Sequence, residues 1–197
     1  HAIGKTHLVN FAIKTAEFAL KFFSDYFGRP YPGDKLDMVA IPDFASGAME
    51  NLGCITYREA LLLVNEEEAT QAELTRIADV VMHEIAHMWF GDLVTMKWWN
   101  GIWLNEAFAT FMATKAVDEF NPKWERWVEF GIEKSAAFDV DSLHSTRPIE
   151  FEVVSPDDAS AMFDLLTYEK GGAVLRMLEQ YVGEDSFREG IRHYLKK

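Results

Sequence analysis

The residues best suited to chemistry begin with His83, Glu84 and His87, which fall within five consecutive positions of an apolar, helix-forming segment. Residues four apart share one face of a helix, so both imidazoles can point at one ion while the glutamate lies beside them. Imidazole nitrogen is a favoured zinc ligand, and a catalytic zinc site keeps three protein ligands and one open position. The same spacing also occurs in ordinary helices, so a third ligand is required.

Glu106 is the candidate third ligand, with eighteen residues between it and His87. It follows Trp103 and precedes Phe108, in a run where a buried carboxylate without a partner would cost several kcal/mol. The alternative is a glutamate on an exposed helix face. Two antiparallel helices would bring Glu106 back to the histidines, so the sequence predicts one Zn²⁺ held by His83, His87 and Glu106.

Glu84 would then be the general base. A bound zinc ion lowers the pKa of its water toward about 7, and Glu84 could take the proton as that water attacks a peptide carbonyl. The attack creates an oxyanion, which the metal and one further donor must stabilise. We expect hydrolysis of a peptide bond. Cobalt or manganese could replace zinc in vitro.

A second group of residues precedes a strand-like segment at 54–64. It consists of Gly47, Ala48, Met49, Glu50 and Asn51. Small residues leave backbone groups open to an extended peptide, and a carboxylate at Glu50 could receive the ammonium group of a free amino terminus. Without any comparison, a turn with a solvated glutamate explains these residues as well.

Together, the Gly-Ala-Met-Glu-Asn segment, the His-Glu-x-x-His pentapeptide and Glu106 resemble the aminopeptidase N family of zinc metallopeptidases, the gluzincins. The resemblance covers nearly the whole chain, through a Tyr-Glu-Lys-Gly segment at 168–171. It implies a thermolysin-like catalytic domain with one Zn²⁺ per chain and peptide substrates that have a free amino terminus. It also implies an aminopeptidase that hydrolyses the first peptide bond.

The resemblance assigns a role to each candidate residue. It implies that the zinc ligands are His83, His87 and Glu106, that the base is Glu84 and the amino-terminus anchor Glu50, that Gly47 and Ala48 supply backbone contacts, and that Tyr168 donates to the oxyanion. From the residues alone, a phenol at a helix start packs more often than it reacts. The Gly171-Gly172 pair after Tyr168 allows a close approach between helices.

Two positions depart from the family pattern, and neither removes a catalytic group. Asp92 stands where relatives commonly have Asn, and Ala107 where many have Gly. Family members also carry an amino-terminal β-rich domain, which supplies a second acidic anchor, and a helical carboxy-terminal domain. We therefore expect a piece excised from a longer multidomain protein, able to hold zinc yet turning over poorly by itself.

The elements that must position these residues follow from hydrophobic periodicity. The pattern predicts an amphipathic helix at 6–27, strands at 35–41 and 54–64 interrupted by a glycine-containing segment at 46–53, and helices thereafter. The first helix after the strands opens with a capping box at Thr70 and Glu73, runs through His87 and breaks at Gly91. Later helices are expected at 103–120, after Asn121, and at 157–166, 168–182 and 185–195, with an irregular stretch at 140–156 that could border a cleft.

This order predicts an α+β fold, a small mixed sheet followed by a mostly helical bundle. We treat residues 1–197 as one domain, with a helix and sheet at about 1–65, zinc-binding helices at about 69–120 and further helices at 122–197. The aromatic residues Trp89, Phe90, Trp98, Trp99 and Trp103 are expected in the core. Trp124 and Trp127 are expected to form a packing stripe on one helix.

Charge and composition exclude several classes of protein. A net charge of −13 disfavours nucleic acid as a partner, because it would repel a phosphate backbone. No apolar run is long enough to cross a membrane. Cys54 is the only cysteine, which rules out an internal disulfide and leaves the compartment open, with a slight preference for the reducing cytosol.

Three other functions remain open from the sequence. A thermolysin-like endopeptidase would share the metal site but would have no use for an anchor that holds a free ammonium. A zinc-stapled module could bind peptides without turning them over. Hydrolysis of a lipid epoxide is known from one branch of the family. The preferred residue, the physiological substrate and the oligomeric state do not follow from the sequence.

Overall fold

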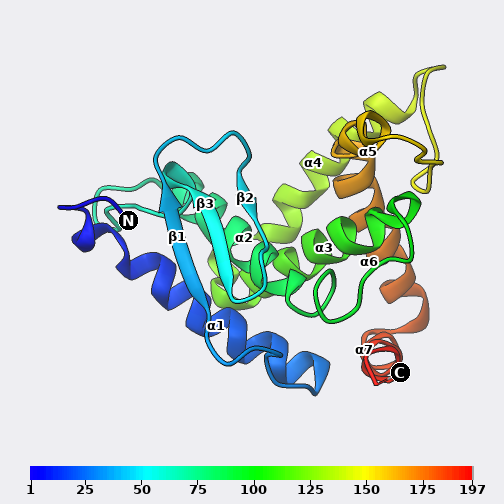
Figure 1. Cartoon of the computed structure of the whole chain (residues 1–197). Coiled ribbons are helices and arrows are strands. Elements are labelled where there is room, and N and C mark those ends of the chain that lie inside the picture. Colours follow the sequence, from blue (N-terminus) through cyan, green and yellow to red (C-terminus); the bar gives the residue numbers. More distant parts are fainter. Residues whose placement is uncertain (197) are drawn as a thin grey trace.

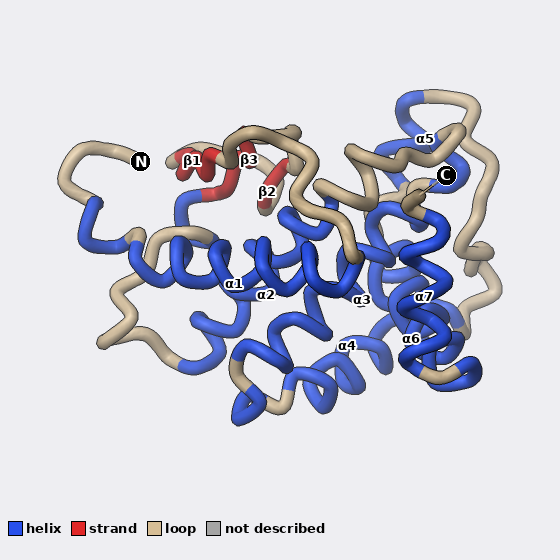
Figure 2. Tube along the Cα trace, turned by 90° about the horizontal axis from the view of Figure 1, so that it is seen from below, coloured by secondary structure: helices blue, strands red, loops and turns tan. Residues whose placement is uncertain are grey.

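The computed structural model describes residues 1–196, in which a small sheet lies on one side of a layer of helices (Figure 1; Figure 2). The strands are β1 (Asp37–Ile41), β2 (Ala48–Met49) and β3 (Cys54–Arg58). The helices are α1 (Asn10–Phe27), α2 (Gln71–His87), α3 (Trp103–Phe120), α4 (Arg126–Asp141), α5 (Pro156–Ala161), α6 (Gly171–Val182) and α7 (Glu184–Tyr194). The predicted α+β architecture is confirmed.

The strands lie in the order β1-β3-β2. The sheet is mixed, as predicted, because it contains one parallel and one antiparallel pair. β3 pairs in parallel with β1 and antiparallel with β2, and Thr56 of β3 lies between Val39 and Met49. β2 therefore forms an edge of the sheet, and it arises from the segment at 46–53 that the sequence left as an interruption. The prediction of a strand at 54–64 was too long, because the chain leaves β3 after Arg58 in a 3₁₀ turn, Glu59–Leu61.

The helices of the first half begin and end where local chemistry requires. α1 ends at Gly28, whose φ of 62° is the left-handed conformation that favours glycine. α2 begins with the predicted capping box: the Thr70 hydroxyl accepts from the backbone N–H of Glu73 at 3.3 Å, and the Glu73 carboxylate accepts from that of Thr70 at 2.8 Å. The prediction of a helix at 6–27 is corrected at its start, because residues Thr6–Leu8 form a separate 3₁₀ turn.

The second half needs three corrections. After Asn121 the chain makes only a 3₁₀ turn, Pro122–Trp124, and α4 begins at Arg126, because Glu125 adopts a φ of 51° that interrupts the helix. α5 ends at Ala161, well short of residue 166. The expected helix at 168–182 is α6 preceded by a π-helical turn, Leu166–Lys170. π-helical turns are rare and frequently lie at functional sites.

The largest hydrophobic cluster is formed by α1, α2, α3 and the inner face of the sheet. Its fully buried side chains include Phe23, Ile55, Tyr57, Trp89 and Phe111. α2 and α3 pack antiparallel, since Glu106 contacts His87 near the end of α2 and Thr110, one turn later, contacts His83 one turn earlier. Over residues 1–196, no helix combines the length and the apolar character that crossing a membrane requires.

Two of the aromatic residues predicted in the core are exposed. Trp89 and Phe90 are buried, as expected, but Trp98 and Trp99 are 58% and 42% exposed. Trp98 precedes a short 3₁₀ turn, Trp99–Gly101, and Trp99 begins it, so neither residue lies on an amphipathic helix that would turn it toward the interior. The indole N–H of Trp98 instead donates to the backbone carbonyl of Val153 at 2.9 Å and ties the loop before α5 to this segment. Trp124 and Trp127 pack against the main cluster, but the prediction that they share one helix is wrong: Trp124 ends the 3₁₀ turn and Trp127 lies in α4, because the left-handed Glu125 separates the two elements.

Candidate active site

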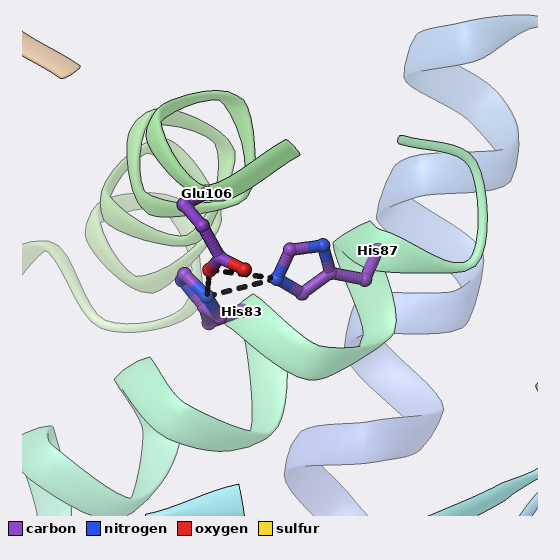
Figure 3. Close-up of side chains that lie close together, drawn as sticks. All are labelled: His83, His87 and Glu106. Carbon is purple, nitrogen blue, oxygen red and sulfur yellow. Dashed lines mark hydrogen bonds and ion pairs between the residues drawn. The ribbon is translucent and has the colours of Figure 1, made fainter. Parts of the chain in front are cut away.

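Three side chains from α2 and α3 converge on one point (Figure 3). The Nε2 atoms of His83 and His87 lie 3.0 Å apart, and Glu106 Oε2 lies 3.2 Å from the first and 3.3 Å from the second. Zinc ligands at about 2.0–2.1 Å in tetrahedral geometry would lie about 3.3 Å from one another. The spacing of the three atoms therefore matches a metal site.

The hydrogen bonds behind the imidazoles turn their Nε2 lone pairs toward this point. His87 Nδ1 lies 3.0 Å from the carbonyl oxygen of Phe90, and because a carbonyl can only accept, Nδ1 carries the proton. His83 Nδ1 lies 3.4 Å from the hydroxyl of Thr110 on α3. Such outer partners commonly fix the ring orientation and the tautomer of a metal-binding histidine.

Burial sets the electrostatics of the cluster. Glu106 is only 4% exposed, and His87 is 1% exposed. Burial lowers the pKa of His83, which favours the neutral imidazole that a metal requires. Although burial by itself opposes ionisation of Glu106, the facing histidines hold the pKa of its carboxyl well below the ordinary value. Although burial opposes a charge on His87, the Glu106 carboxylate raises the pKa of His87 to about 10 in the metal-free site. A metal ion would therefore displace a proton from His87, which leaves two imidazoles and an ionised carboxylate, a donor set that suits zinc.

Glu84 lies between the two histidines in the sequence of α2 and is a buried carboxylate with an unpartnered oxygen. It is 7% exposed, and its Oε2 atom has no hydrogen-bond partner. Burial, with help from Glu50 and Glu106, raises the pKa of Glu84 to about 8. Ligand atoms of Glu50, Glu84 and His87 also lie within 4.8 Å of one another. A carboxyl group that exchanges a proton near neutral pH suits a general base.

The cluster opens into a cavity of about 1130 Å³. α2 and α3 form its floor, through residues such as Val80, His83, Thr110 and Ala113. β2 borders one side, and α5 with the preceding loop borders the other; both views place β2 as the strand nearest α5 (Figure 1; Figure 2). The irregular stretch predicted to border a cleft therefore does so through its last residues, 153–156.

The edge strand β2 presents most of the predicted substrate-binding residues to this cavity. Gly47, Ala48, Met49 and Glu50 all line it. Ala48 and Met49 pair with β3 on one side only, so the other side of the strand is free to pair with an extended chain. Asn51 is exposed and outside the cavity lining, and its side-chain amide donates to the Met49 carbonyl at 3.4 Å.

Tyr168 reaches the same site from the π-helical turn. Its ring stacks beside that of His83, with centroids 5.8 Å apart. Burial first, and then the carboxylate of Glu106, raise the pKa of Tyr168 far above its ordinary value, so the phenol keeps its proton and can donate. A methyl group at Gly171 would lie 2.5 Å from the Cβ of Ala107, so this glycine permits the close contact that holds the turn against α3.

Several cavity residues were not identified from the sequence. Trp98 and Trp99 were assigned to the core, and Thr110, Asp79 and Arg126 were not considered. Asp79 does carry a signal, since it lies four residues before His83 and therefore on the face of α2 that bears the histidine. No local sequence pattern predicts that Arg126 lines the cavity, because its position depends on how α4 packs against the other helices.

Comparisons with known proteins give a family match and several relatives. Residues 11–197 match the peptidase family M1 domain. The chain is 47% identical to aminopeptidase M1-A of Oryza sativa subsp. japonica and 48% identical to probable aminopeptidase 2 of Sulfurisphaera tokodaii, over 99% and 98% of its length. It is 46% identical to a leucyl aminopeptidase of Saccharolobus solfataricus over 98% of its length. The chain spans only 22–25% of the length of these relatives.

Proposed function

This chain belongs to peptidase family M1, and we propose that it carries the active site of a zinc-dependent aminopeptidase. The observation that carries the proposal is the convergence of His83, His87 and Glu106 at 3.0–3.3 Å, in a cavity that Glu50 also lines. These three residues would hold one Zn²⁺. When bound, zinc polarises the scissile carbonyl and lowers the pKa of water.

The remaining residues divide the reaction among them. Glu50 receives the substrate's α-ammonium group, and the free edge of β2 pairs with the extended peptide. Glu84 takes a proton from the attacking water and then delivers it to the leaving amine. Tyr168 donates its phenolic hydrogen to the oxyanion that develops at the carbonyl. Because Glu50 holds a free amino terminus beside the metal ligands, only the first peptide bond reaches the reacting position.

The test measures hydrolysis by the zinc-loaded chain of two substrates: the amide that joins leucine to a fluorogenic amine, and the same compound with its amino group acetylated. Metal content is measured on the same sample. We expect cleavage of the free-amine substrate alone. The variant Glu84→Gln should retain zinc and lose about 10²- to 10⁴-fold in kcat, the contribution typical of general-base catalysis.

The other outcomes identify the competing functions. Cleavage of the acetylated substrate would indicate an endopeptidase and contradict the role of Glu50. Bound zinc with no turnover of either substrate would indicate a peptide-binding module, or a chain that needs the further domains of its longer relatives for turnover. Equal activity of wild type and Glu84→Gln would contradict the assignment of the base.

A further inference from the structure

The π-helical turn Leu166–Lys170, which carries Tyr168, is capped at its start by the side chain of Asp164. Asp164 Oδ1 accepts from the backbone N–H groups of Leu166 at 3.0 Å and of Thr167 at 3.1 Å. The backbone carbonyl of Asp164 also accepts from the N–H of Tyr168 at 3.1 Å. Because the first N–H groups of a helical turn have no partner within the turn, these bonds fix where the turn begins.

Arg147, which lies in the irregular stretch between α4 and α5, holds this cap in place. Its Nη2 donates to Asp164 Oδ1 at 2.6 Å and to the hydroxyl of Thr167 at 2.9 Å. The backbone carbonyl of Met162 lies 3.3 Å from the same nitrogen. Nη1 donates to the carbonyl of Pro148 at 3.1 Å. The guanidinium group thus joins the loop before α5 to the chain on both sides of residue 164.

These contacts form a clasp, which consists of Arg147, Asp164 and Thr167. The side chain of Arg147 is 14% exposed, and Thr167 is fully buried, whereas the side chain of Asp164 is 39% exposed. A hydrogen bond with an ionised partner is stronger than one between neutral groups, and the planar guanidinium holds several acceptors in a fixed arrangement. The clasp therefore restrains the start of the turn from a segment outside it.

The turn is a rare conformation, and it is held at both ends. At its far end Lys170 donates to Asp141 of α4 at 2.6 Å, and Gly171 packs against α3. At its near end the clasp supplies the restraint. Tyr168 lies between the two supports, with its ring stacked beside that of His83. The distance of the phenol from the metal ligands is therefore set partly by the clasp.

The clasp lies behind the turn and not in the cavity. Arg147, Asp164 and Thr167 are outside the cavity lining, whereas Tyr168 is part of it. A substrate in the cavity therefore meets the phenol, and the clasp can act only through the turn. A donor stabilises an oxyanion only at about 2.7–3.1 Å from that oxygen, so a shift of about 1 Å in the turn removes much of its effect.

We propose that Arg147 is a positioning residue for Tyr168. Through Asp164 and Thr167 it sets the position of the π-helical turn, and so it holds the phenolic hydroxyl where this group can donate to the oxyanion. The inference rests on the proposed function, from which it takes the role of Tyr168. Loss of the clasp should leave the metal ligands and the binding of a planar substrate intact, and should weaken only what Tyr168 contributes to the tetrahedral state.

The test measures binding, so that it does not depend on turnover. Calorimetry on the zinc-loaded chain compares leucine amide, whose carbonyl is planar, with a phosphinic analogue of Leu-Ala, in which a tetrahedral phosphinate replaces the cleaved amide. One oxygen of the phosphinate imitates the oxyanion. Tyr168→Phe should weaken binding of the phosphinic analogue about tenfold, the effect of one hydrogen bond to a charged group, and should leave that of leucine amide unchanged.

Arg147→Lys keeps the positive charge but lacks the fork that reaches several acceptors. It should weaken binding of the phosphinic analogue about threefold to tenfold, because it misplaces the donor of the same bond, with leucine amide unaffected. Added to Tyr168→Phe, it should cause no further loss, since the hydroxyl that it positions is already absent. A structural loosening alone would weaken both ligands and would add to the effect of Tyr168→Phe.

Two further variants control for folding and for the loss of an arginine. Thr167→Val removes one acceptor of Arg147 without changing any charge, so it should show the same pattern with a smaller loss, even if Arg147→Lys fails to fold. Arg176→Lys is the matched control, because Arg176 pairs with Glu179 within α6 and lies outside the cavity lining. It should leave both affinities unchanged.

The inference is overturned if the variants of Arg147 and Thr167 bind the phosphinic analogue as wild type does, if their losses add to that of Tyr168→Phe, or if leucine amide is weakened equally. It is also overturned if Tyr168→Phe has no effect, since there is then no donor to position. If neither ligand binds the zinc-loaded wild type, the proposed function fails and the inference fails with it. Binding of the phosphinic analogue to wild type therefore distinguishes the two failures.

Discussion

Two clusters of buried charge occupy opposite ends of one cavity on the same pair of helices. At one end His83, His87 and Glu106 bring three electron-pair donors together within 3.3 Å. At the other end carboxylates gather around Arg126, which donates to Asp79 and Glu133. In the second cluster the chain provides its own cation. In the first it provides two imidazoles and one carboxylate, of which only His87 can carry a proton beside Glu106 when no metal is bound, and this donor set is the one expected where a metal ion completes the site.

The two ends of the cavity are stabilised by different cations. Burying a charge is costly unless it is paired, so both clusters need a cation. Arg126 is covalently part of the fold and is present whenever the chain is folded. Stability at the metal end should instead depend on the concentration of zinc. Substitutions at each end, and in the element that links them, should separate these two behaviours.

The largest effect is expected at the arginine end. Arg126→Ala leaves the partly buried carboxylate of Asp79, whose side chain is 22% exposed, without its cation; this should lower the free energy of unfolding by about 3 kcal/mol, the lower end of the range for a buried pair. Urea denaturation of the zinc-loaded chain measures it. Combining Arg126→Ala with Asp79→Asn removes the unpaired charge and should recover part of the loss. A loss below about 1 kcal/mol in the single variant would show that this end does not rely on its own cation.

The next largest loss of stability is expected in the element that contributes a residue to each end of the cavity. The π-helical turn Leu166–Lys170 carries Tyr168 toward His83 and Glu169 toward the arginine end. Gly171→Ala would place its methyl group 2.5 Å from Ala107 Cβ, and overpacking of this kind costs about 1–3 kcal/mol of unfolding free energy.

A double-mutant cycle checks whether this close contact is the cause. Ala107→Gly removes the opposing methyl group, so the loss in the double variant should be smaller than the sum of the two single losses. Strictly additive losses would mean that the cost of Gly171→Ala arises elsewhere.

A smaller effect is expected from the partners that orient the metal ligands. Thr110→Val removes the hydroxyl that contacts His83 Nδ1 at 3.4 Å, and loss of such a partner should weaken zinc binding about tenfold. Competition with a chromophoric chelator measures the affinity. Thr114→Val is the matched control, because that hydroxyl donates to the Thr110 carbonyl at 2.9 Å and contacts no ligand. Equal losses in the two variants would contradict the role of Thr110.

The smallest effect is a pH dependence at the arginine end. Burial raises the pKa of Glu169 from an ordinary value near 4.5 to about 7. Between these values the folded chain holds a proton that the unfolded chain has lost, so stability falls as pH rises through this window. Glu169→Gln should therefore stabilise the chain at pH 8, by roughly 1 kcal/mol once solvent screening is allowed for, and not at pH 4.

Thermal or urea unfolding at the two pH values measures this difference, with Glu67→Gln as a control on an exposed loop glutamate. A gain of the same size at both pH values would show that the Glu169 carboxyl does not titrate in this window.

How much could be predicted from sequence follows from the range of the interactions involved. The helical period placed His83 and His87 on one face, and the capping residue Thr70 fixed where α2 begins. The π-helical turn and the brief edge strand β2 have no comparable local signal. Exposure of Trp98 and the pairing of Arg126 with Asp79 depend on contacts between segments about fifty residues apart, which no local pattern reports.

The measurement that tests the central contrast most directly is the unfolding free energy of the chain with and without zinc, in wild type and in Glu106→Gln. With free zinc at 100 times the dissociation constant, wild type should gain about 2.7 kcal/mol. Glu106→Gln at the same zinc concentration should gain little, because it has lost one of the three ligands. Equal stabilisation of the two proteins, or none in wild type, would contradict a metal centre at His83, His87 and Glu106.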